Sequence, residues 1–563
     1  MNRRVAVYLF LFSSFTVLWG GVSSCIGYRE DSADLVEVRS QLVDSSWLWG
    51  HHELDRLAST WGAGREAKAG LAILDALVGN DDLDHRVPAA ESLTAFPVGL
   101  LLQRALEEQR YQGCLRLVAL LKAAGAPGFD EFAAAALLEL GRFAEARKIQ
   151  LPEENRTQLA SRLGSVLGGD LETTLVRDRR GNLLGKVAAE EGASFMPEAG
   201  IAESLVPKVV LAGLDELGPA KSVRLTIDLE LSQMALRALG SYHGSIVVVD
   251  PKDGSVLAAV SDRRSYSREG SPALEQLREP ASIAKIITVS AALRAGIDVD
   301  QVLQELVCRG SEPFDDGLLY CSAINGRLRG LNRAMAVSCN VAFAHLGKLV
   351  GREALLDEYA RYGFDLEGAD GAYLGRVLQP EPKGRELGEL AVGLEATAIT
   401  PVHAALQAGM VANGGYMLPP HLFRSTDSFL GFSERLLPAS SGWRVLEDAW
   451  LPILVGAMEA VVQPGGTAAR VAPSSFPVAL KTGTASDPRT GFHVNYIGFG
   501  PQPEPRYAFA VRVTHQRTSR RVRNAAFAVT RRFLRGLAEF ERNNPDPDPE
   551  PPRDSHLATS LAG

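Results

Sequence analysis

The sequence predicts a multidomain protein, with an all-α N-terminal region followed by an α/β domain in which helices flank a mainly antiparallel sheet. The length of 563 residues is sufficient for two or three domains. Apolar residues recur with helical periodicity within residues 26–165. Between residues 221 and 542, strand-type apolar runs bounded by turn residues occur together with Ala-rich helical segments, a pattern typical of layered α/β domains.

Residues 1–25 have the pattern of an export signal or a membrane anchor. Arg3 and Arg4 precede a mostly apolar run over residues 5–22, which is borderline in length for a spanning helix. The run ends in Val22-Ser23-Ser24-Cys25, which resembles a bacterial lipobox and would make Cys25 a lipidation site. An uncleaved anchor helix and plain secretion are the alternatives. We therefore expect the remaining chain on the periplasmic side of the cell envelope, held at a membrane through its N-terminus.

Residues 26–165 are predicted to be helical, with helices at residues 100–109, 112–124, 130–140 and 142–149. A pattern recurs at an offset of 32 residues, because Arg110-Tyr111-Gln112-Gly113-Cys114 matches Arg142-Phe143-Ala144-Glu145-Ala146. This period resembles that of tetratricopeptide repeats, whose helix pairs form concave surfaces for protein partners. A protein partner on this region is one expectation, and a plain helical bundle that separates the next domain from the membrane is the other.

The segments on either side of the α/β domain have a different composition. Residues 166–220 are predicted to form a strand-rich linker or pedestal-like region. A final helix is expected at residues 521–541, and residues 543–563 form a tail whose first half is rich in Pro, Asp and Glu and which we expect to be disordered.

The most informative feature of the α/β region is Ser282-Ile283-Ala284-Lys285, an S-x-x-K motif. Pro280 and the apolar, Ala-rich residues after Lys285 predict that Ser282 lies at a helix N-terminus. Positions i and i+3 share a helix face, so Lys285 could reach the Ser282 hydroxyl, and a buried lysine can lose its proton and act as a base. Alone, the motif is equally compatible with a serine and a lysine on a solvated face.

A second motif, Ser338-Cys339-Asn340, lies between two apolar segments and predicts a short turn between buried helices. Its Ser and Asn could hydrogen-bond to a substrate amide. Considered by itself, it would be interpreted as a helix cap.

A third motif, Lys481-Thr482-Gly483-Thr484, continues an apolar run at residues 476–480 and predicts an edge strand. Return strands are expected at residues 493–498 and 507–513. Gly483 would let another backbone approach closely, and the edge could pair with an extended peptide. The amine of Lys481 and the hydroxyls of Thr482 and Thr484 could bind a carboxylate. The alternative is an ordinary surface strand.

The S-x-x-K, S-x-N and K-T-G motifs, in this order, resemble those of penicillin-binding protein transpeptidases, the acyl-serine D,D-transpeptidases. The resemblance covers roughly residues 220–540. It includes a predicted opening hairpin at residues 244–258, and a short match to the D-R-x-G element of class B members at residues 176–182. No glycosyltransferase domain fits before residue 220, so we expect a monofunctional enzyme.

The resemblance implies a role for each motif residue. Ser282 would be the acylated nucleophile and Lys285 its general base, while Ser338 and Asn340 would relay protons and hold the stem peptide. Lys481, Thr482, Gly483 and Thr484 would recognise the terminal carboxylate, and the N–H groups of Ser282 and Thr484 would form the oxyanion hole. The sequence departs from the family at Ala281, where glycine is common, and at Asn495, where tryptophan is expected.

The implied function is peptidoglycan D,D-transpeptidation, with stem peptides as substrates and β-lactams as covalent ligands. A D,D-carboxypeptidase or a β-lactamase would use the same chemistry with water as the acceptor. An envelope scaffold or sensor with a weakly active penicillin-binding domain is an alternative of another class.

Charge and cysteine content bear on the kind of partner and on possible disulfide and metal sites. The net charge of −8 argues against nucleic acid as a partner. Cys308 and Cys321 flank an acidic loop and could form a disulfide in an oxidising compartment, whereas two free thiols are the alternative. Cys114 is expected in a helical core. No spacing indicates a zinc or iron–sulfur site, so no metal or cofactor is expected.

Overall fold

A computed structural model describes the chain from residue 35 to residue 545. The residues in this span that are not described are 36, 40, 44–45, 59–63, 80–87, 127, 152–158, 160–162, 164–165, 168–172, 189–194, 199–213, 215–216, 218–219, 263–270, 368–373, 380, 431–433, 438–440, 488–490 and 516–518. The predicted export segment with Cys25, and nearly all of the predicted tail, lie outside the described residues. None of the helices within the described ranges has the length and apolar character needed to span a bilayer.

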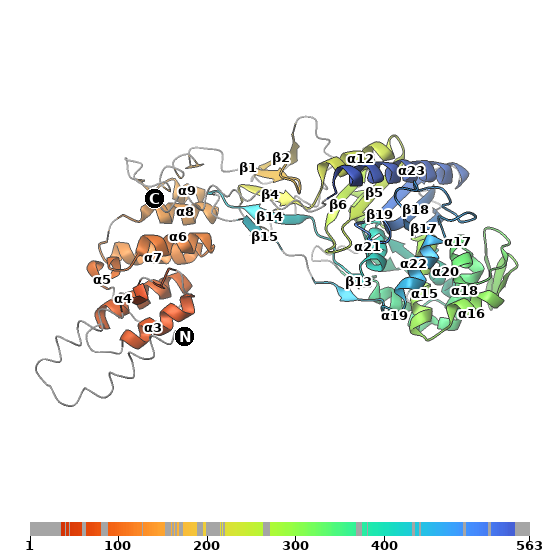
Figure 1. Ribbon diagram of the computed structural model, residues 1–563, viewed down its shortest axis with the longest axis horizontal. Coiled ribbons are helices and arrows are strands. Elements are labelled where there is room, and N and C mark those ends of the chain that lie inside the picture. The colour runs from red at the N-terminus through yellow and green to blue at the C-terminus, as the bar shows by residue number, and fades with distance from the viewer. Residues whose placement is uncertain are drawn as a thin grey trace, which may run out of the picture. The chain divides into compact units, whose positions relative to one another are not determined.

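The chain divides into two compact units (Figure 1). The smaller unit comprises Met1–Thr174, Leu217–Ser222 and Thr426–Arg435. The larger unit comprises Leu175–Glu216, Val223–Ser425 and Leu436–Gly563. Each of the two units therefore contains segments from distant parts of the sequence.

The smaller unit consists mainly of helices that pack against their neighbours in the chain. Its longer helices are α3 (Trp47–Ala58), α4 (Gly64–Val78), α5 (Ala90–Thr94), α6 (Val98–Glu107), α7 (Tyr111–Ala123), α8 (Asp130–Glu139) and α9 (Phe143–Ala146). Helices α6, α7 and α8 lie within two residues of the predicted bounds. Helix α9 ends three residues earlier than expected, because the chain from Lys148 continues in turns with i→i−3 hydrogen bonds.

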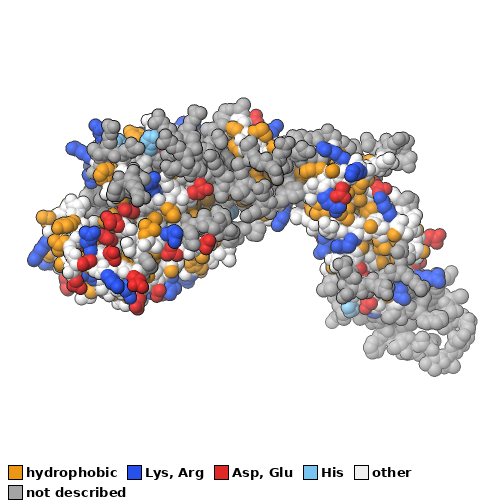
Figure 2. All heavy atoms as spheres, turned by 180° about the vertical axis from the view of Figure 1, so that it is seen from behind, with side chains coloured by type: hydrophobic (Ala, Val, Ile, Leu, Met, Phe, Trp, Pro, Cys, Tyr) orange, Lys and Arg blue, Asp and Glu red, His pale blue; other side chains and the backbone are white. Residues whose placement is uncertain are grey.

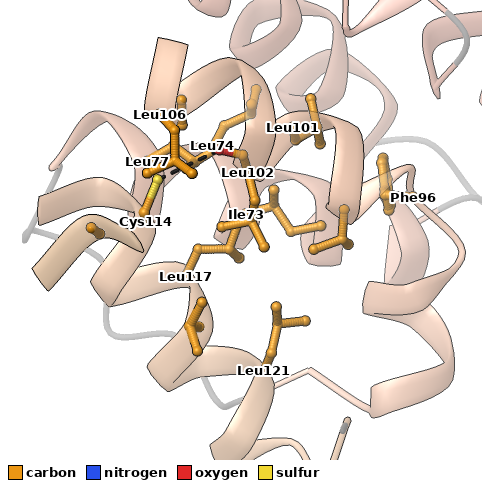
Figure 3. Packing of buried hydrophobic residues seen from close by; sticks show 14 of the residues in the cluster. Ile73, Leu74, Leu77, Phe96, Leu101, Leu102, Leu106, Cys114, Leu117 and Leu121 are labelled. Atoms are coloured by element: carbon orange, nitrogen blue, oxygen red, sulfur yellow. Dashed lines mark hydrogen bonds between the residues drawn. The ribbon is translucent and has the colours of Figure 1, made fainter. Parts of the chain in front are cut away.

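Leucine and alanine side chains fill the core of the smaller unit (Figure 3). Leu102 and Leu117 are fully buried, and the Cys114 thiol donates to the carbonyl of Leu102 at 3.6 Å. Cys114 is thus a core residue, as the helical pattern predicts. A Cβ at Gly113 would lie 2.3 Å from the Leu77 carbonyl oxygen, so this glycine allows α7 to approach α4 closely.

The 32-residue sequence repeat has a counterpart in the backbone. Arg110 and Arg142 have nearly the same conformation, with φ, ψ of −85°, 52° and −84°, 55°. The residues before them, Gln109 and Gly141, both have positive φ. Each arginine N–H donates to the carbonyl five residues earlier. Equivalent positions therefore make the same helix-to-helix turn.

A five-stranded antiparallel sheet forms the centre of the larger unit, in the order β17-β18-β19-β5-β6. Its strands are β5 (His243–Val249), β6 (Val256–Ser261), β17 (Ala479–Asp487), β18 (Gly491–Gly500) and β19 (Tyr507–His515). The predicted opening hairpin and the three later strands are all present, and β17 is at the edge of this sheet as expected.

Helices cover both faces of this sheet (Figure 1). Side chains alternate between faces along a strand. Accordingly, Ala508 of β19 lies next to Gly409 of α21 (Pro401–Ala412), whereas its neighbour Phe509 stacks edge-on against Phe533 of α23 (Ser519–Asn543). Helix α12 (Leu229–Leu239) packs against α23 on the same face. The expected α/β architecture with an antiparallel sheet is therefore confirmed for this unit.

The helices that carry the first two motifs lie on the face covered by α21, together with other helices and several small sheets. The helices are α14 (Pro272–Glu275), the 3₁₀ helix η2 (Ala281–Ala284), α15 (Lys285–Arg294), α16 (Val299–Glu305), α17 (Leu331–Ala336), α18 (Asn340–Val350), α19 (Arg352–Arg361), α20 (Arg385–Val392) and α22 (Leu451–Glu459). Two-stranded sheets join β7 (Val307–Cys308) to β10 (Gly326–Arg327), β8 (Ser311–Phe314) to β9 (Gly317–Tyr320), β11 (Gly375–Val377) to β12 (Thr397–Ile399), and β13 (Tyr416–Met417) to β16 (Trp443–Arg444).

A further sheet of six strands has the order β15-β14-β4-β1-β2-β3. It consists of β1 (Thr173–Arg177), β2 (Leu183–Ala188), β3 (Phe195–Pro197), β4 (Ser222–Leu225), β14 (Phe423–Asp427) and β15 (Glu434–Leu436). The chain passes from one unit to the other within β1, β4, β14 and β15. On the face seen in Figure 2, acidic and basic side chains of the described residues are interspersed.

Candidate active site

The first motif occupies a tight turn at the start of a helix. Ser282 lies in η2, and Lys285 begins α15 directly after it. The predicted helix N-terminus is therefore present, with a 3₁₀ turn as its first part. The half-buried Ser282 hydroxyl makes no hydrogen bond to any described residue. A serine in this position is free to contact an incoming group.

Ala281, directly before Ser282, is held in an unfavourable backbone conformation. Its φ is +52°, in the left-handed region that costs a non-glycine residue about 1–2 kcal/mol. Ala281 is fully buried, and its N–H donates to the carbonyl of Gly393 at 2.8 Å. A Cβ at Gly393 would lie 2.4 Å from the Ala281 carbonyl oxygen. Tight packing against the segment around Gly393 therefore helps to hold the conformation that precedes the serine.

The buried amine of Lys285 contacts the second motif. Its Nζ donates to the Ser338 carbonyl at 2.8 Å, to the Ser338 hydroxyl at 3.3 Å and to Asn340 Oδ1 at 2.7 Å. The direct bond to Ser282 that the i, i+3 spacing predicts is not formed, because these three oxygens hold the amine. Burial lowers the pKa of Lys285 to about 7. A substantial fraction of this amine is thus neutral near pH 7.

Ser338 lies between the two motif lysines. It occupies the turn between α17 and α18 with φ of +54°, as the apolar flanks predict for a turn between helices. Its hydroxyl accepts from Lys481 Nζ at 2.8 Å as well as from Lys285. Burial, followed by the charge of Lys285, lowers the pKa of Lys481 well below its ordinary value. The Ser338 hydroxyl therefore links two buried amines whose pKa values are both lowered.

The third motif brings the edge strand against the nucleophile turn. A Cβ at Gly483 would lie 2.7 Å from the Pro280 carbonyl oxygen and 3.3 Å from the Ala281 Cβ, which explains the need for glycine. The buried Lys481 also donates to the Thr482 carbonyl at 2.7 Å, whereas Thr484 is exposed on the strand. The structure therefore places all three motifs around Ser338 and η2.

Thr467 was missed by the sequence interpretation. Its hydroxyl hydrogen-bonds to that of Thr482 at 2.7 Å, and its N–H donates to the Ala336 carbonyl at 2.9 Å. Thr467 thus links the third motif to the helix before the second. The pair Gly465-Gly466, which marks a turn directly before Thr467, is the signal that could have indicated it.

The predicted Cys308–Cys321 disulfide is not present, since both residues are free cysteines in the structure. Cys339, the middle residue of the second motif, completes a group of three thiols whose sulfurs all lie within 4.8 Å of one another. The sulfurs of Cys321 and Cys339 lie 3.8 Å apart, so Cys321 contacts the second motif. Because the three lie on separate elements, their spacing in sequence does not indicate the group.

Comparison with known families and proteins identifies relatives of the larger unit. Residues 244–534 match the family model described as "Penicillin binding protein transpeptidase domain". The chain is 30% identical over 342 residues to "Peptidoglycan D,D-transpeptidase PbpA" of Mycolicibacterium smegmatis, covering 52% of this chain and 67% of that protein. It is 28% identical over 323 residues to the protein of the same name from Mycobacterium tuberculosis, covering 49% and 62%.

Solved structures show the same fold. The crystal structure of PBPA from Mycobacterium tuberculosis superposes with a TM-score of 0.53 at 22% identity, covering 64% of this chain and 98% of that one. Penicillin-binding protein 3 from the same organism, in its apo form, gives 0.56 at 21% identity, covering 67% and 97%. The chain thus aligns with 62% of the length of the curated Mycobacterium tuberculosis protein and with nearly all of the solved structures.

Proposed function

Starting from the premise that the chain belongs to the penicillin-binding protein transpeptidase family, we propose that it is a peptidoglycan D,D-transpeptidase that forms an acyl-enzyme on Ser282. The observation that supports this most strongly is the Ser338 hydroxyl, which accepts hydrogen bonds from Lys285 at 3.3 Å and Lys481 at 2.8 Å. This arrangement joins the three motifs into one proton-transfer network.

In the proposed first step, the Ser282 oxygen attacks the carbonyl carbon of the penultimate D-alanine of a stem peptide, and neutral Lys285 takes the serine proton. The peptide C–N bond breaks, and the leaving D-alanine amine receives a proton through Ser338. The low pKa of Lys285 suits it to this role, because a base must be partly neutral at the working pH. The ester on Ser282 retains the donor peptide.

In the second step, the amine of another stem peptide attacks the ester carbonyl, the ester C–O bond breaks, and the serine oxygen regains its proton. Lys481, Thr482, Gly483 and Thr484 would bind the donor carboxylate, and the N–H groups of Ser282 and Thr484 would stabilise the oxyanion. Thr484 is exposed on an edge strand, where an extended peptide could pair. A β-lactam would acylate Ser282 in the same way.

We also propose that the chain acts in the cell envelope, anchored to a membrane through residues 1–25 either by lipidated Cys25 or by a helix. The smaller unit would carry tetratricopeptide-like repeats that bind a protein partner. The equal backbone turns at Arg110 and Arg142, 32 residues apart, support a tandem repeat.

Labelling of the full chain with a fluorescent penicillin tests the proposed chemistry. We expect stoichiometric covalent labelling of the wild type and of Ser441→Ala, which changes an exposed serine, and none of Ser282→Ala. Equal labelling of wild type and Ser282→Ala would reject the assignment. The lifetime of the adduct then separates the candidates, because release within seconds would indicate a β-lactamase. Persistent labelling combined with loss of cross-linking in Lys285→Ala would reject a pure scaffold.

A further inference from the structure

The segment that leads into Ser282 is held through its backbone carbonyls by side chains of the central sheet. The Gln276 carbonyl accepts from Arg512 Nη1 at 2.9 Å. The Glu279 and Pro280 carbonyls each accept from Asn495 Nδ2 at 3.3 Å. His493 Nε2 lies 2.9 Å from the same Glu279 oxygen. The attachment therefore reaches the residue that immediately precedes the strained Ala281.

Asn495 and Arg512 are cross-strand neighbours. In the sheet, Asn495 of β18 lies opposite Gly483 of β17 on one side and opposite Arg512 of β19 on the other. Asn495 Oδ1 accepts from Arg512 Nε at 2.9 Å, which leaves both hydrogens of Nδ2 for the two carbonyls. One row of the sheet thus provides space for the nucleophile turn at Gly483 and hydrogen-bond donors for it at Asn495.

Arg512 forms no ion pair with a carboxylate of the described residues, which is unusual for a buried cation. It is 1% exposed, and its three nitrogens donate to Asn495, to Gln276 and, through Nη2 at 2.8 Å, to the Ile399 carbonyl. All three acceptors are neutral oxygens. Burying a guanidinium in such surroundings costs more than burying an apolar side chain of similar volume. Core packing alone therefore does not account for an arginine here.

We propose that Asn495 and Arg512 are positioning residues for the nucleophile. Arg512 fixes the Asn495 amide in one orientation, and Asn495 holds the Glu279 and Pro280 carbonyls. This attachment keeps Ala281 in its left-handed conformation and directs the Ser282 hydroxyl towards Ser338. The two positions that depart from the family pattern, Ala281 and Asn495, thus belong to the same attachment that orients Ser282. The consequence for rate rests on the proposed acylation of Ser282.

Acylation kinetics of the full chain with a fluorescent penicillin test this proposal. In Asn495→Leu, which keeps the side-chain volume and removes the amide, we expect the first-order acylation constant at saturation to fall about 10- to 100-fold. The concentration giving half-saturation and the final labelling stoichiometry should change less than about threefold. Arg512→Met should lower the rate constant in the same way. A variant that is merely misfolded would instead lose stoichiometry while its active fraction reacts at the normal rate, and that result would overturn the proposal.

Two further variants sharpen the test. Thr226→Val removes another buried polar group of the larger unit, whose Oγ1 bonds to the Val256 carbonyl at 2.8 Å, and should lower stability without changing the acylation constant. Adding Ala281→Gly to Asn495→Leu removes the steric cost of positive φ. The acylation constant of the double variant should be roughly fivefold higher than that of Asn495→Leu alone. A further decrease in rate would contradict the proposed link between these two positions.

Hydrogen exchange provides a measurement that does not depend on activity. The Ala281 N–H, which donates to Gly393, should exchange at least tenfold faster in Asn495→Leu than in wild type or Thr226→Val. Unchanged exchange would overturn the proposed attachment. If the wild type itself is not acylated, the proposed function fails, and the exchange result alone decides the role of Asn495.

Discussion

Among the described residues, the buried lysine and arginine side chains all belong to the larger unit. In the larger unit, Lys285, Lys481 and Arg512 are at most 1% exposed and donate to neutral oxygens. The described core of the smaller unit consists mainly of alanine and leucine. One of its buried carboxylates, Glu139, accepts from the backbone N–H groups of Phe429 at 3.0 Å and Leu430 at 2.8 Å.

This difference separates the requirements of chemistry from those of packing. A buried cation without an acid partner lowers stability, so a function best explains why the larger unit contains three such groups. A buried carboxylate that ties a distant segment to a helix end is explained by structure alone. Changes in the charges of the larger unit should therefore alter rates, and changes in the smaller unit should alter stability.

The largest expected effect is the dependence of acylation on pH. Because burial lowers the pKa of Lys285 to about 7 and its neutral form is the proposed base, the acylation constant should rise about 50-fold from pH 5 to pH 7. Above pH 8 it should level off. Stopped-flow measurements with a penicillin would record the profile.

Substitutions at the two lysines identify the titrating group. Lys285→Met should lose most of the acylation rate, and the remaining rate should no longer rise between pH 5 and pH 7. Lys481→Arg, which places a permanent positive charge on the other side of Ser338, should be slower overall and retain the rise of the rate with pH. A wild-type rate that is constant from pH 5 to pH 9 would show that Lys285 is not the base, and would remove the main distinction between the two units.

The sequence was sufficient to predict the motif side chains and the strands that carry them. Local signals were strong there. Pro280 precedes a helix start, apolar flanks surround Ser338, and the strand-type run before Lys481 lies at a sheet edge. Helices α6 to α9 of the smaller unit followed from apolar periodicity, with α9 shorter than expected, whereas the bounds of α3, α4 and α5 were not predicted.

Contacts between distant segments could not be predicted in this way. The sequence placed Lys285 near Ser282, but the amine is held by oxygens 53 and 55 residues away. Arg512 interrupts an apolar strand, and only the cross-strand pairing shows that it meets Asn495. The three thiols near the second motif likewise come together through tertiary packing. Local spacing carries no information on such pairings.

A smaller effect is expected from removing packing in the smaller unit. Leu102→Ala, at a fully buried position of α6, should lower the free energy of unfolding of that unit by about 2–5 kcal/mol. Chemical denaturation followed by circular dichroism would measure it. Leu100→Ala on the same helix, where the side chain is 55% exposed, should cost less than about 0.5 kcal/mol. Neither variant should change the acylation constant by more than about twofold; a larger change would show that the two units are energetically coupled.

The smallest expected effect concerns Glu139. Glu139→Gln leaves one of the two backbone N–H donors facing the N–H of the new amide. The substitution should therefore lower the free energy of unfolding by about 1–3 kcal/mol and increase hydrogen exchange at Phe429 and Leu430. Burial raises the pKa of Glu139, so the folded protein binds this proton more readily than the unfolded chain. The wild type therefore gains stability relative to the glutamine variant as the pH falls towards 4.5, and the difference between them should increase. Glu145→Gln, which changes one partner of an exposed ion pair with Arg142, should leave stability almost unchanged at any of these pH values. If the two substitutions behaved alike, the hydrogen bonds from Phe429 and Leu430 to Glu139 would contribute nothing to the stability of the smaller unit.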